Sequence, residues 1–361
     1  MTQTVDSERD SQSSVDALFR AYQGLAPGAS VAVMRDGATL FRRAYGLADV
    51  ESRRAATPAT NYRLASMTKQ FTATAILLLA EDGRLSVDDP VRGWLPTLPD
   101  AADGITIRHL LTHRSGLADY EDLIPPGTCA QLHDADVLGL LETEHRSYFS
   151  PGTSYRYSNS AYVLLALIVG RASGKDFAAF LHERIFQPLG MQNTVAFESG
   201  RSDVAHRAFG YSATGQSWTR TDQSLTSATL GDGGIYSSID DLAKWDAALG
   251  DSRLLKPASL GLAFASATQT DDPAVQYGFG WRITGRTRWH SGETIGFRNV
   301  IVRYPDERFT VIVLTNRDDP SCYPAALAIA KIFLPHADVA DAACAVHTAS
   351  GPDPRARLLP R

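Results

Sequence analysis

Alternation of hydrophobic and polar residues marks two sets of β-strands, one near each end of the chain. The first set is a hairpin in which residues 29–34 and 38–45 flank the turn Arg35-Asp36-Gly37. An Asp-Gly pair between alternating runs is typical of a tight β-turn. The second set has four strand segments, with a turn at residues 305–307 between the last two: 277–283, 287–290, 297–304 and 309–315.

Between the two strand sets the hydrophobic period is that of helices. Residues 66–81 are apolar on every side after their first turn, so we expect a central, buried helix that begins at Ser66 and ends at Gly83. The pattern predicts seven more helices: 15–22, a helix starting at 107, 137–144, 160–172, 177–185, 239–249 and 323–334.

This order of elements predicts an α/β protein of the α+β type. Strands at both ends of the chain imply one antiparallel sheet built from the two termini, with helices on its faces. We expect a single domain over residues 15–335, with a sheet lobe at about 15–65 and 275–335 and a mainly helical lobe at about 66–274. Residues 1–14 are polar and predict a disordered tail, and residues 336–361 predict a loose one.

Composition narrows the possible partners and the location. The 361 residues carry a formal charge of −5 and have a pI near 6.0, so neither nucleic acid nor an anionic membrane is an expected partner. No segment reaches the ~20 apolar residues that a membrane-spanning helix needs, and the N-terminus lacks the pattern of a signal peptide. Three cysteines (Cys129, Cys322 and Cys344) without metal-ligand spacing suit a reducing compartment. These features predict a cytoplasmic protein.

Ser66 and Lys69 form the first candidate for chemistry. On a helix, residues three apart lie on one face, so the Lys69 amine can reach the Ser66 hydroxyl. A serine hydroxyl needs a neighbouring base to become a nucleophile, and burial can lower the pKa of a lysine enough for it to serve. Alternatively, Ser66 only caps the helix and Lys69 points into solvent. The chain has only five lysines, which makes a chance match less frequent.

Tyr157 and Asn159 form the second candidate. A phenol near a lysine ammonium ionises more easily and can relay a proton to a leaving group. The Asn159 amide can donate and accept hydrogen bonds at the same time. Alternatively, Ser158 or Asn159 caps the helix that starts at Ser160, and Tyr157 is a packed aromatic residue; capping and catalysis are compatible.

The third candidate, His290-Ser291-Gly292, stands at the end of a predicted strand. Gly292 would let a substrate lie against the strand edge. The backbone N–H of Glu293 could then join that of Ser66 as an oxyanion hole. A single histidine is more often structural than functional, but this one follows the other two fragments in order.

Together, Ser66-Met67-Thr68-Lys69, Tyr157-Ser158-Asn159 and His290-Ser291-Gly292 resemble the three motifs of one enzyme family. These are the serine hydrolases with a penicillin-binding fold: class C β-lactamases, DD-peptidases and related esterases. The likeness extends over about residues 15–335 and includes the stretches 107–117, 150–153 and 231–235.

The resemblance implies an acyl-enzyme mechanism without metal or organic cofactor. It makes Ser66 the nucleophile and Lys69 and Tyr157 the acid/base pair. The substrate-binding residues that it implies are Asn159, His290, Ser291 and Gly292.

Two departures from the family pattern bear on the substrate, which we expect to be a small ester, amide or β-lactam. Typical β-lactamases of this family carry Lys-Thr-Gly where this chain has His290-Ser291-Gly292, and a histidine is mostly uncharged near pH 7. A weaker anchor for a substrate carboxylate, together with the absence of a visible export signal, favours an esterase. A DD-peptidase, a D-amino-acid peptidase and a weak β-lactamase are the alternatives.

Other functional classes fit the sequence less well. No Gly-x-Ser-x-Gly occurs, so the nucleophile elbow of α/β-hydrolases is absent. His182-Glu183 begins a zinc-protease motif, but Phe186 replaces its second histidine. A non-catalytic penicillin-binding or assembly protein remains the rival from another class. The oligomeric state is not predicted by any of these patterns.

Overall fold

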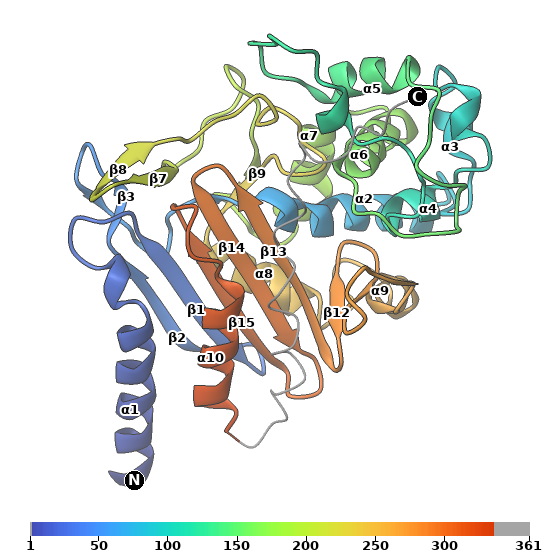
Figure 1. The fold of residues 1–361 in the computed structure, drawn as a ribbon. Coiled ribbons are helices and arrows are strands. Elements are labelled where there is room, and N and C mark those ends of the chain that lie inside the picture. Colours follow the sequence, from blue (N-terminus) through green and yellow to red (C-terminus); the bar gives the residue numbers. More distant parts are fainter. Residues whose placement is uncertain (1, 336–361) are drawn as a thin grey trace.

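The computed structural model describes residues 2–335; residue 1 and residues 336–361, where a loose tail and Cys344 were predicted, lie outside the described part. An eight-stranded antiparallel sheet dominates one side of the molecule (Figure 1). In spatial order its strands are β10 (Thr268–Gln269), β11 (Gln276–Tyr277), β12 (Arg282–Thr284), β13 (Thr287–Thr294), β14 (Phe297–Tyr304), β15 (Phe309–Thr315), β1 (Ala29–Arg35) and β2 (Ala38–Tyr45).

The sheet joins the two ends of the chain. Strand β1 pairs with β15, with Ala29 opposite Thr315 and Arg35 opposite Phe309. The N-terminal hairpin β1–β2 therefore extends the C-terminal meander β12–β15, which confirms the predicted sheet of two termini. All seven residues of β15 are buried, because helices cover both faces of the sheet centre.

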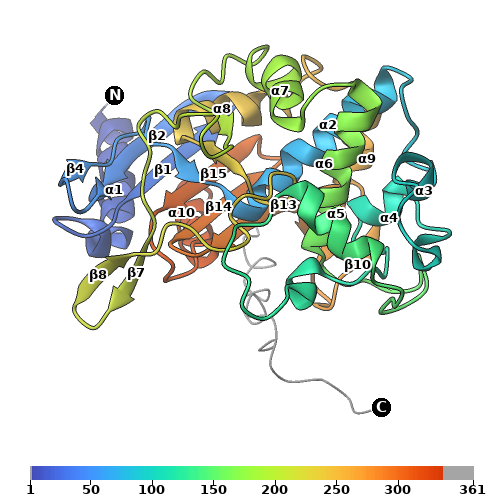
Figure 2. The same cartoon turned by 90° about the horizontal axis from the view of Figure 1, so that it is seen from above.

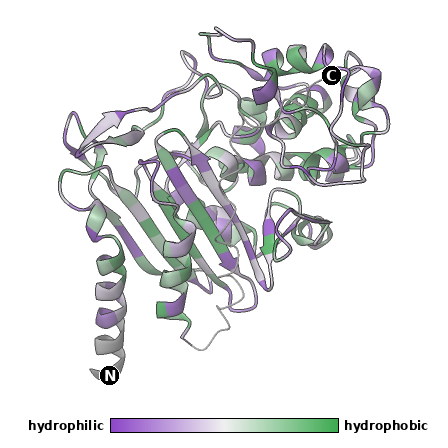
Figure 3. Ribbon diagram, in the orientation of Figure 1, coloured by the Kyte–Doolittle hydropathy of each residue, from purple (hydrophilic) through white to green (hydrophobic). Residues whose placement is uncertain are grey.

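Each face of the sheet has its own hydrophobic core. Helices α1 (Thr2–Leu18) and α10 (Tyr323–Phe333) cover one face, where Val311 and Val313 of β15 are buried. Helix α8 (Ile239–Ala248) covers the other face, where Ile312 of the same strand is buried in one core with Trp245. Successive side chains of a strand point to opposite faces, so the apolar run from Val311 to Leu314 in β15 supplies both cores. Figure 3 shows hydrophobic residues along the strands of the sheet.

The prediction of a disordered tail over residues 1–14 is wrong for the residues that the structure describes, because α1 starts at Thr2. Val15 and Phe19 are 0% and 1% exposed and anchor the C-terminal end of this helix on the sheet. No glycine or proline occurs before residue 24, so the helix continues outward from the anchor. Polar composition alone does not show that anchor.

The other side of the molecule is mainly helical (Figure 2). Its helices are α2 (Lys69–Glu81), α3 (Val91–Trp94), α4 (Ile107–Leu111), α5 (Asp134–Glu142), α6 (Asn159–Ser173), α7 (Phe177–Leu181) and α9 (Pro257–Phe264). The first eleven residues of α2 are all buried, as its all-round hydrophobicity predicts. Within the described residues, no helix has both the length and the hydrophobicity to cross a bilayer.

The predicted lobe boundaries differ from the structure in two respects. Helix α8 falls within the range assigned to the helical lobe but packs on the sheet. The same range also contains short strands, which have only two to four residues each and cannot show a period of two. They are β6 (Val195–Ala196), β7 (Tyr211–Thr214), β8 (Ser217–Arg220) and β9 (Ile235–Ser237).

The strand predicted over residues 277–283 is two strands, β11 and β12, separated by a turn. Gly280 has a φ of +76°, which favours glycine. A Cβ atom there would lie 2.7 Å from the carbonyl oxygen of Lys69. The turn therefore passes directly against the first turn of α2 and brings β12 to the helix that follows Ser66.

Candidate active site

Ser66 lies in a tight turn at the junction of the sheet and the helical side. The predicted helix start is a 3₁₀ turn, Ala65–Thr68, and α2 begins only at Lys69. Ala65 has a φ of +50°, a left-handed conformation that is uncommon for alanine and is found at functional sites. Ser66 is half-buried, so its hydroxyl remains within reach of a ligand.

Lys69 is fully buried and makes three hydrogen bonds. Its Nζ donates to Ser66 Oγ at 3.1 Å, to Asn159 Oδ1 at 2.8 Å and to the carbonyl oxygen of Asp232 at 3.1 Å. These acceptors are neutral, and no carboxylate in the described part of the chain forms an ion pair with Lys69. Three neutral acceptors therefore hold the amine in a fixed position beside Ser66.

Tyr157 packs beside the lysine. The centre of its ring lies 4.8 Å from Lys69 Nζ, and its hydroxyl is buried without a hydrogen-bond partner among the described residues. His113 supports this segment: its ring centre lies 4.3 Å from that of Tyr157, and its Nδ1 accepts the Ser158 N–H at 3.1 Å. Burial, followed by the charge of Lys69, holds the pKa of His113 well below its usual range, so this support stays uncharged.

Asn159 begins helix α6, and the preceding Ser158 caps that helix by accepting the Ala161 N–H at 3.2 Å. The side-chain Nδ2 of Asn159 donates to Glu121 Oε1 at 2.9 Å, and its backbone N–H donates to Asp119 Oδ2 at 2.8 Å. Capping and contact with Lys69 thus coexist in adjacent residues.

Glu121 introduces a titratable carboxyl group beside Asn159. The residue reaches solvent, but the protein packed around its carboxyl group, and then the charge of Asp119, raise the pKa of Glu121 to about 7. Glu121 is not among the residues that the sequence predicts for the site. Its position depends on the loop between α4 and α5, which has no regular period.

Strand β13 carries the third motif along the Ser66 turn. A Cβ atom on Gly292 would lie only 1.9 Å from the carbonyl oxygen of Leu64, so only glycine allows the strand to approach the turn this closely. Ser291 and Glu293, on either side of Gly292, are half-buried. Glu293 forms a long ion pair with Arg298 at 3.8 Å.

His290 is 1% exposed and uncharged. Its Nδ1 lies 2.6 Å from the Ser291 carbonyl oxygen and must donate to it, so Nε2 accepts the Tyr277 hydroxyl at 3.0 Å. Burial, followed by the charges of Arg282 and Lys69, holds the pKa of His290 well below its usual range. This histidine therefore provides no positive charge for a substrate carboxylate.

Arg282 brings a positive charge to the site, although it is not among the residues predicted from the sequence. Arg282 of β12 has its guanidinium carbon 5.4 Å from the ring centre of Tyr157, and its Nε is buried without a partner. It forms no ion pair with any described carboxylate. The paired glycines of the preceding turn, Gly278 and Gly280, are the sequence signal that could have indicated a chain reversal toward the site.

The structure thus brings together three sequence-predicted residues, Ser66, Lys69 and Asn159, in direct hydrogen bonds. The remaining predicted residues surround them at longer range, and the rings of Tyr157 and His290 lie 6.3 Å apart. Among residues 2–335 no group of His, Cys, Asp or Glu side chains is arranged to hold a metal ion. The arrangement can generate a serine nucleophile beside a lysine base.

Comparisons with known proteins identify the family of this chain. The model of the Beta-lactamase family matches residues 15–332. Penicillin-binding protein 4* of Bacillus subtilis is 33% identical over 317 residues, which are 82% of this chain and 70% of that protein. The D-aminopeptidase of Gluconobacter oxydans is 31% identical over 84% of this chain, but this chain spans only 58% of that enzyme's length.

A solved structure shows the same fold. The octameric penicillin-binding protein homologue from Pyrococcus abyssi superposes with a TM-score of 0.78 at 26% identity, over 90% of this chain and 77% of that one. This likeness confirms the predicted fold class, and the family match over nearly the whole described chain confirms the resemblance inferred from the three motifs. The chain belongs to the beta-lactamase family of serine hydrolases.

Proposed function

We propose that the protein hydrolyses small carboxylic esters and amides through an acyl-enzyme on Ser66. The observation that carries this proposal is the 3.1 Å hydrogen bond between Lys69 Nζ and Ser66 Oγ, in a lysine that has no carboxylate partner among the described residues. An uncharged Lys69 removes the Ser66 proton while Oγ attacks the substrate carbonyl carbon. The carbon–oxygen bond to Ser66 forms, and the leaving group departs with a proton relayed through Tyr157.

Deacylation reverses the roles of the same groups. A water molecule attacks the ester on Ser66, its proton passes to the Tyr157–Lys69 pair, and the carboxylic acid leaves as Ser66 regains its proton. The backbone N–H groups of Ser66 and Glu293 are proposed to stabilise the oxyanion in both steps. The close approach of Gly292 to Leu64 supports this pairing, because it sets the backbone of β13 beside the Ser66 turn.

An ester without a carboxylate anchor is the leading substrate class. The buried, uncharged His290 supports this choice, since dedicated β-lactamases of the family carry a lysine at that motif position. We expect the purified protein to turn over p-nitrophenyl butyrate rapidly and a chromogenic cephalosporin slowly, with Ser66→Ala as the control in both assays. Rapid cephalosporin turnover would contradict this preference and would indicate that Arg282 supplies the missing positive charge.

The position of Glu121 favours a second candidate function, hydrolysis of D-amino-acid amides or peptides with a free amino group. Its carboxylate, next to Asn159, can pair with a substrate ammonium. The similarity to a D-aminopeptidase points the same way. The experiment that separates the two candidates compares D-alanine p-nitroanilide with the p-nitrophenyl ester.

Glu121→Gln is expected to lower kcat/KM for D-alanine p-nitroanilide by about 10- to 100-fold, because it removes one charged hydrogen bond to the substrate. Ester hydrolysis by the same variant should be unchanged. Only the ionised form of Glu121 pairs with an ammonium group. With a pKa of about 7, the preference for the amine substrate should therefore rise between pH 6 and pH 7 and should be absent from the variant. An equal loss on both substrates would instead assign Glu121 to the stability of the site.

The cytoplasm is the location that we propose. The thiols of Cys129 and Cys322, both free, support a reducing compartment. In a cell fractionation, we expect the protein in the soluble fraction of spheroplasts, with none released by osmotic shock.

A further inference from the structure

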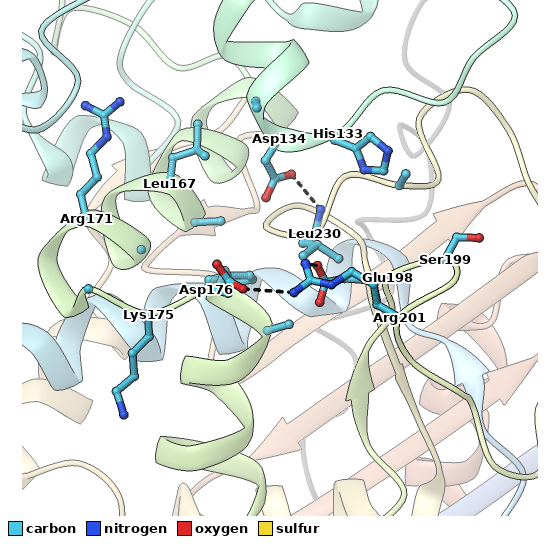
Figure 4. Close-up of a pocket in the computed structure, with 17 residues that line it drawn as sticks. His133, Asp134, Leu167, Arg171, Lys175, Asp176, Glu198, Ser199, Arg201 and Leu230 are labelled. Carbon is cyan, nitrogen blue, oxygen red and sulfur yellow. Dashed lines mark hydrogen bonds and ion pairs between the residues drawn. The ribbon is translucent and has the colours of Figure 1, made fainter.

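A pocket of about 700 Å³ lies on the helical side of the molecule (Figure 4). Its walls come from the first residues of α5, the C-terminal half of α6, the start of α7 and two loops around residues 199 and 229. None of the sequence-predicted site residues lines it. Asp134, the first residue of α5, lines the pocket and points toward Leu230 in Figure 4.

Asp134 holds the backbone of the loop from Leu230 to Gly234, here called the 230–234 loop. Its Oδ1 accepts the Leu230 N–H at 2.8 Å. No described cation pairs with Asp134. Burial raises the pKa of Asp134 to about 8. Asp134 is half-buried. A carboxyl group packed in protein without a counter-charge is costly unless hydrogen bonds compensate it, and here the compensating bond comes from this loop.

The same loop carries one of the acceptors of Lys69. Two residues after Leu230, the carbonyl oxygen of Asp232 accepts a hydrogen bond from Lys69 Nζ at 3.1 Å. The Gly231 carbonyl between them accepts Thr72 Oγ1 at 2.6 Å. Gly231 has no room for a side chain, because a Cβ atom would lie 2.3 Å from the Tyr162 carbonyl oxygen. The loop is therefore clamped between Asp134 on the pocket side and α2 on the catalytic side.

We infer that Asp134 is a positioning residue for the catalytic lysine: by fixing the 230–234 loop it fixes the Asp232 carbonyl that orients Lys69 Nζ toward Ser66. This inference deepens the proposed function and rests on it. A displacement of about 1 Å at a catalytic group can lower the rate about 10²-fold. The effect is expected in the acylation step, where Lys69 acts, and not in substrate binding.

Asp134→Ala is therefore expected to lower kcat for p-nitrophenyl butyrate by about 10- to 100-fold, with KM changed by less than about twofold, as for an interaction that matters in the transition state. Asp134→Asn retains one acceptor oxygen and should recover a large part of the loss. The acylation rate should be measured in a single turnover and divided by the number of active sites that release p-nitrophenol. This normalisation removes any contribution from unfolded protein.

Asp136→Ala is the matched control. Asp136 lies in the same first turn of α5, and its carboxylate accepts the His133 N–H at 2.8 Å but does not contact the 230–234 loop. Both variants remove one acidic residue from the same helix start, so a loss confined to Asp134 isolates the loop contact. Unchanged acylation per active site in Asp134→Ala, or an equal loss in Asp136→Ala, would overturn the inference. Failure of the wild-type enzyme to acylate would instead refute the proposed function.

Discussion

Replacing Ser66 by alanine is expected to abolish ester hydrolysis, with a fall in kcat on the order of 10⁶-fold, as when the nucleophile of other serine hydrolases is removed. The Ser66 Oγ is the atom to which Lys69 donates at 3.1 Å, and alanine has no atom in its place. The measurement is the release of p-nitrophenol from p-nitrophenyl butyrate, followed both as an initial burst and at steady state.

The fold of Ser66→Ala should be intact. Lys69 keeps its hydrogen bonds to Asn159 and Asp232, and alanine fits the small space of the serine, so the melting temperature should change little. Mass spectrometry after exposure to an ester of slow deacylation should show the acyl adduct on the wild type alone. Turnover by the variant above about one thousandth of the wild-type rate would refute the mechanism, because the oxyanion hole alone can leave only a small residual rate.

Replacing Lys69 by methionine should lower the acylation rate by about 10³- to 10⁴-fold, the contribution typical of a general base together with its positioning. Methionine keeps much of the lysine's volume in this fully buried position, and it removes the amine that takes the Ser66 proton. Stopped-flow measurement of the first turnover isolates this step from deacylation.

Lys331→Met is the control for the loss of one lysine, because Lys331 is exposed on α10. It should acylate at the wild-type rate. Since Lys69→Met also leaves the acceptors of Asn159 and Asp232 without their donor, its melting temperature is expected to fall, and rates must be compared per folded site. A loss of less than about tenfold would mean that another group serves as the base.

The elements that the sequence predicted well are those with long, regular patterns. The predicted strands 297–304 and 309–315 have the bounds of β14 and β15, and the helix predicted to start at residue 107 is α4. Each is marked by the pattern of neighbouring residues, so the local sequence carries the information. The wrong predictions concern elements that are very short or that depend on residues far away in the chain. Helix α1 is of the second kind, because the sheet face that anchors it is made near the other end of the chain.

The residues of the candidate site fall into the same two groups: those that local spacing predicts and those that only packing brings together. Ser66 and Lys69 stand three residues apart, and the members of the other two motifs stand two apart, so this local spacing can be read directly from the sequence. The acceptor that Asp232 offers to Lys69 lies 163 residues away along the chain. The charge of Glu121 comes from a segment without a regular period. That of Arg282 comes from β12, whose path toward the site depends on the turn before it.

The sequence by itself therefore determined the two-terminus sheet, the buried helix after the nucleophile turn and the three motifs. Only the tertiary structure decided the electrostatics of the site: an uncharged His290, an Arg282 beside Tyr157 without an ion-pair partner among the described residues, and a carboxyl group of Glu121 that titrates near neutral pH. The physical reason is that periodicity depends on neighbours in the chain. Charge states depend instead on burial and on distances between side chains that packing alone brings together.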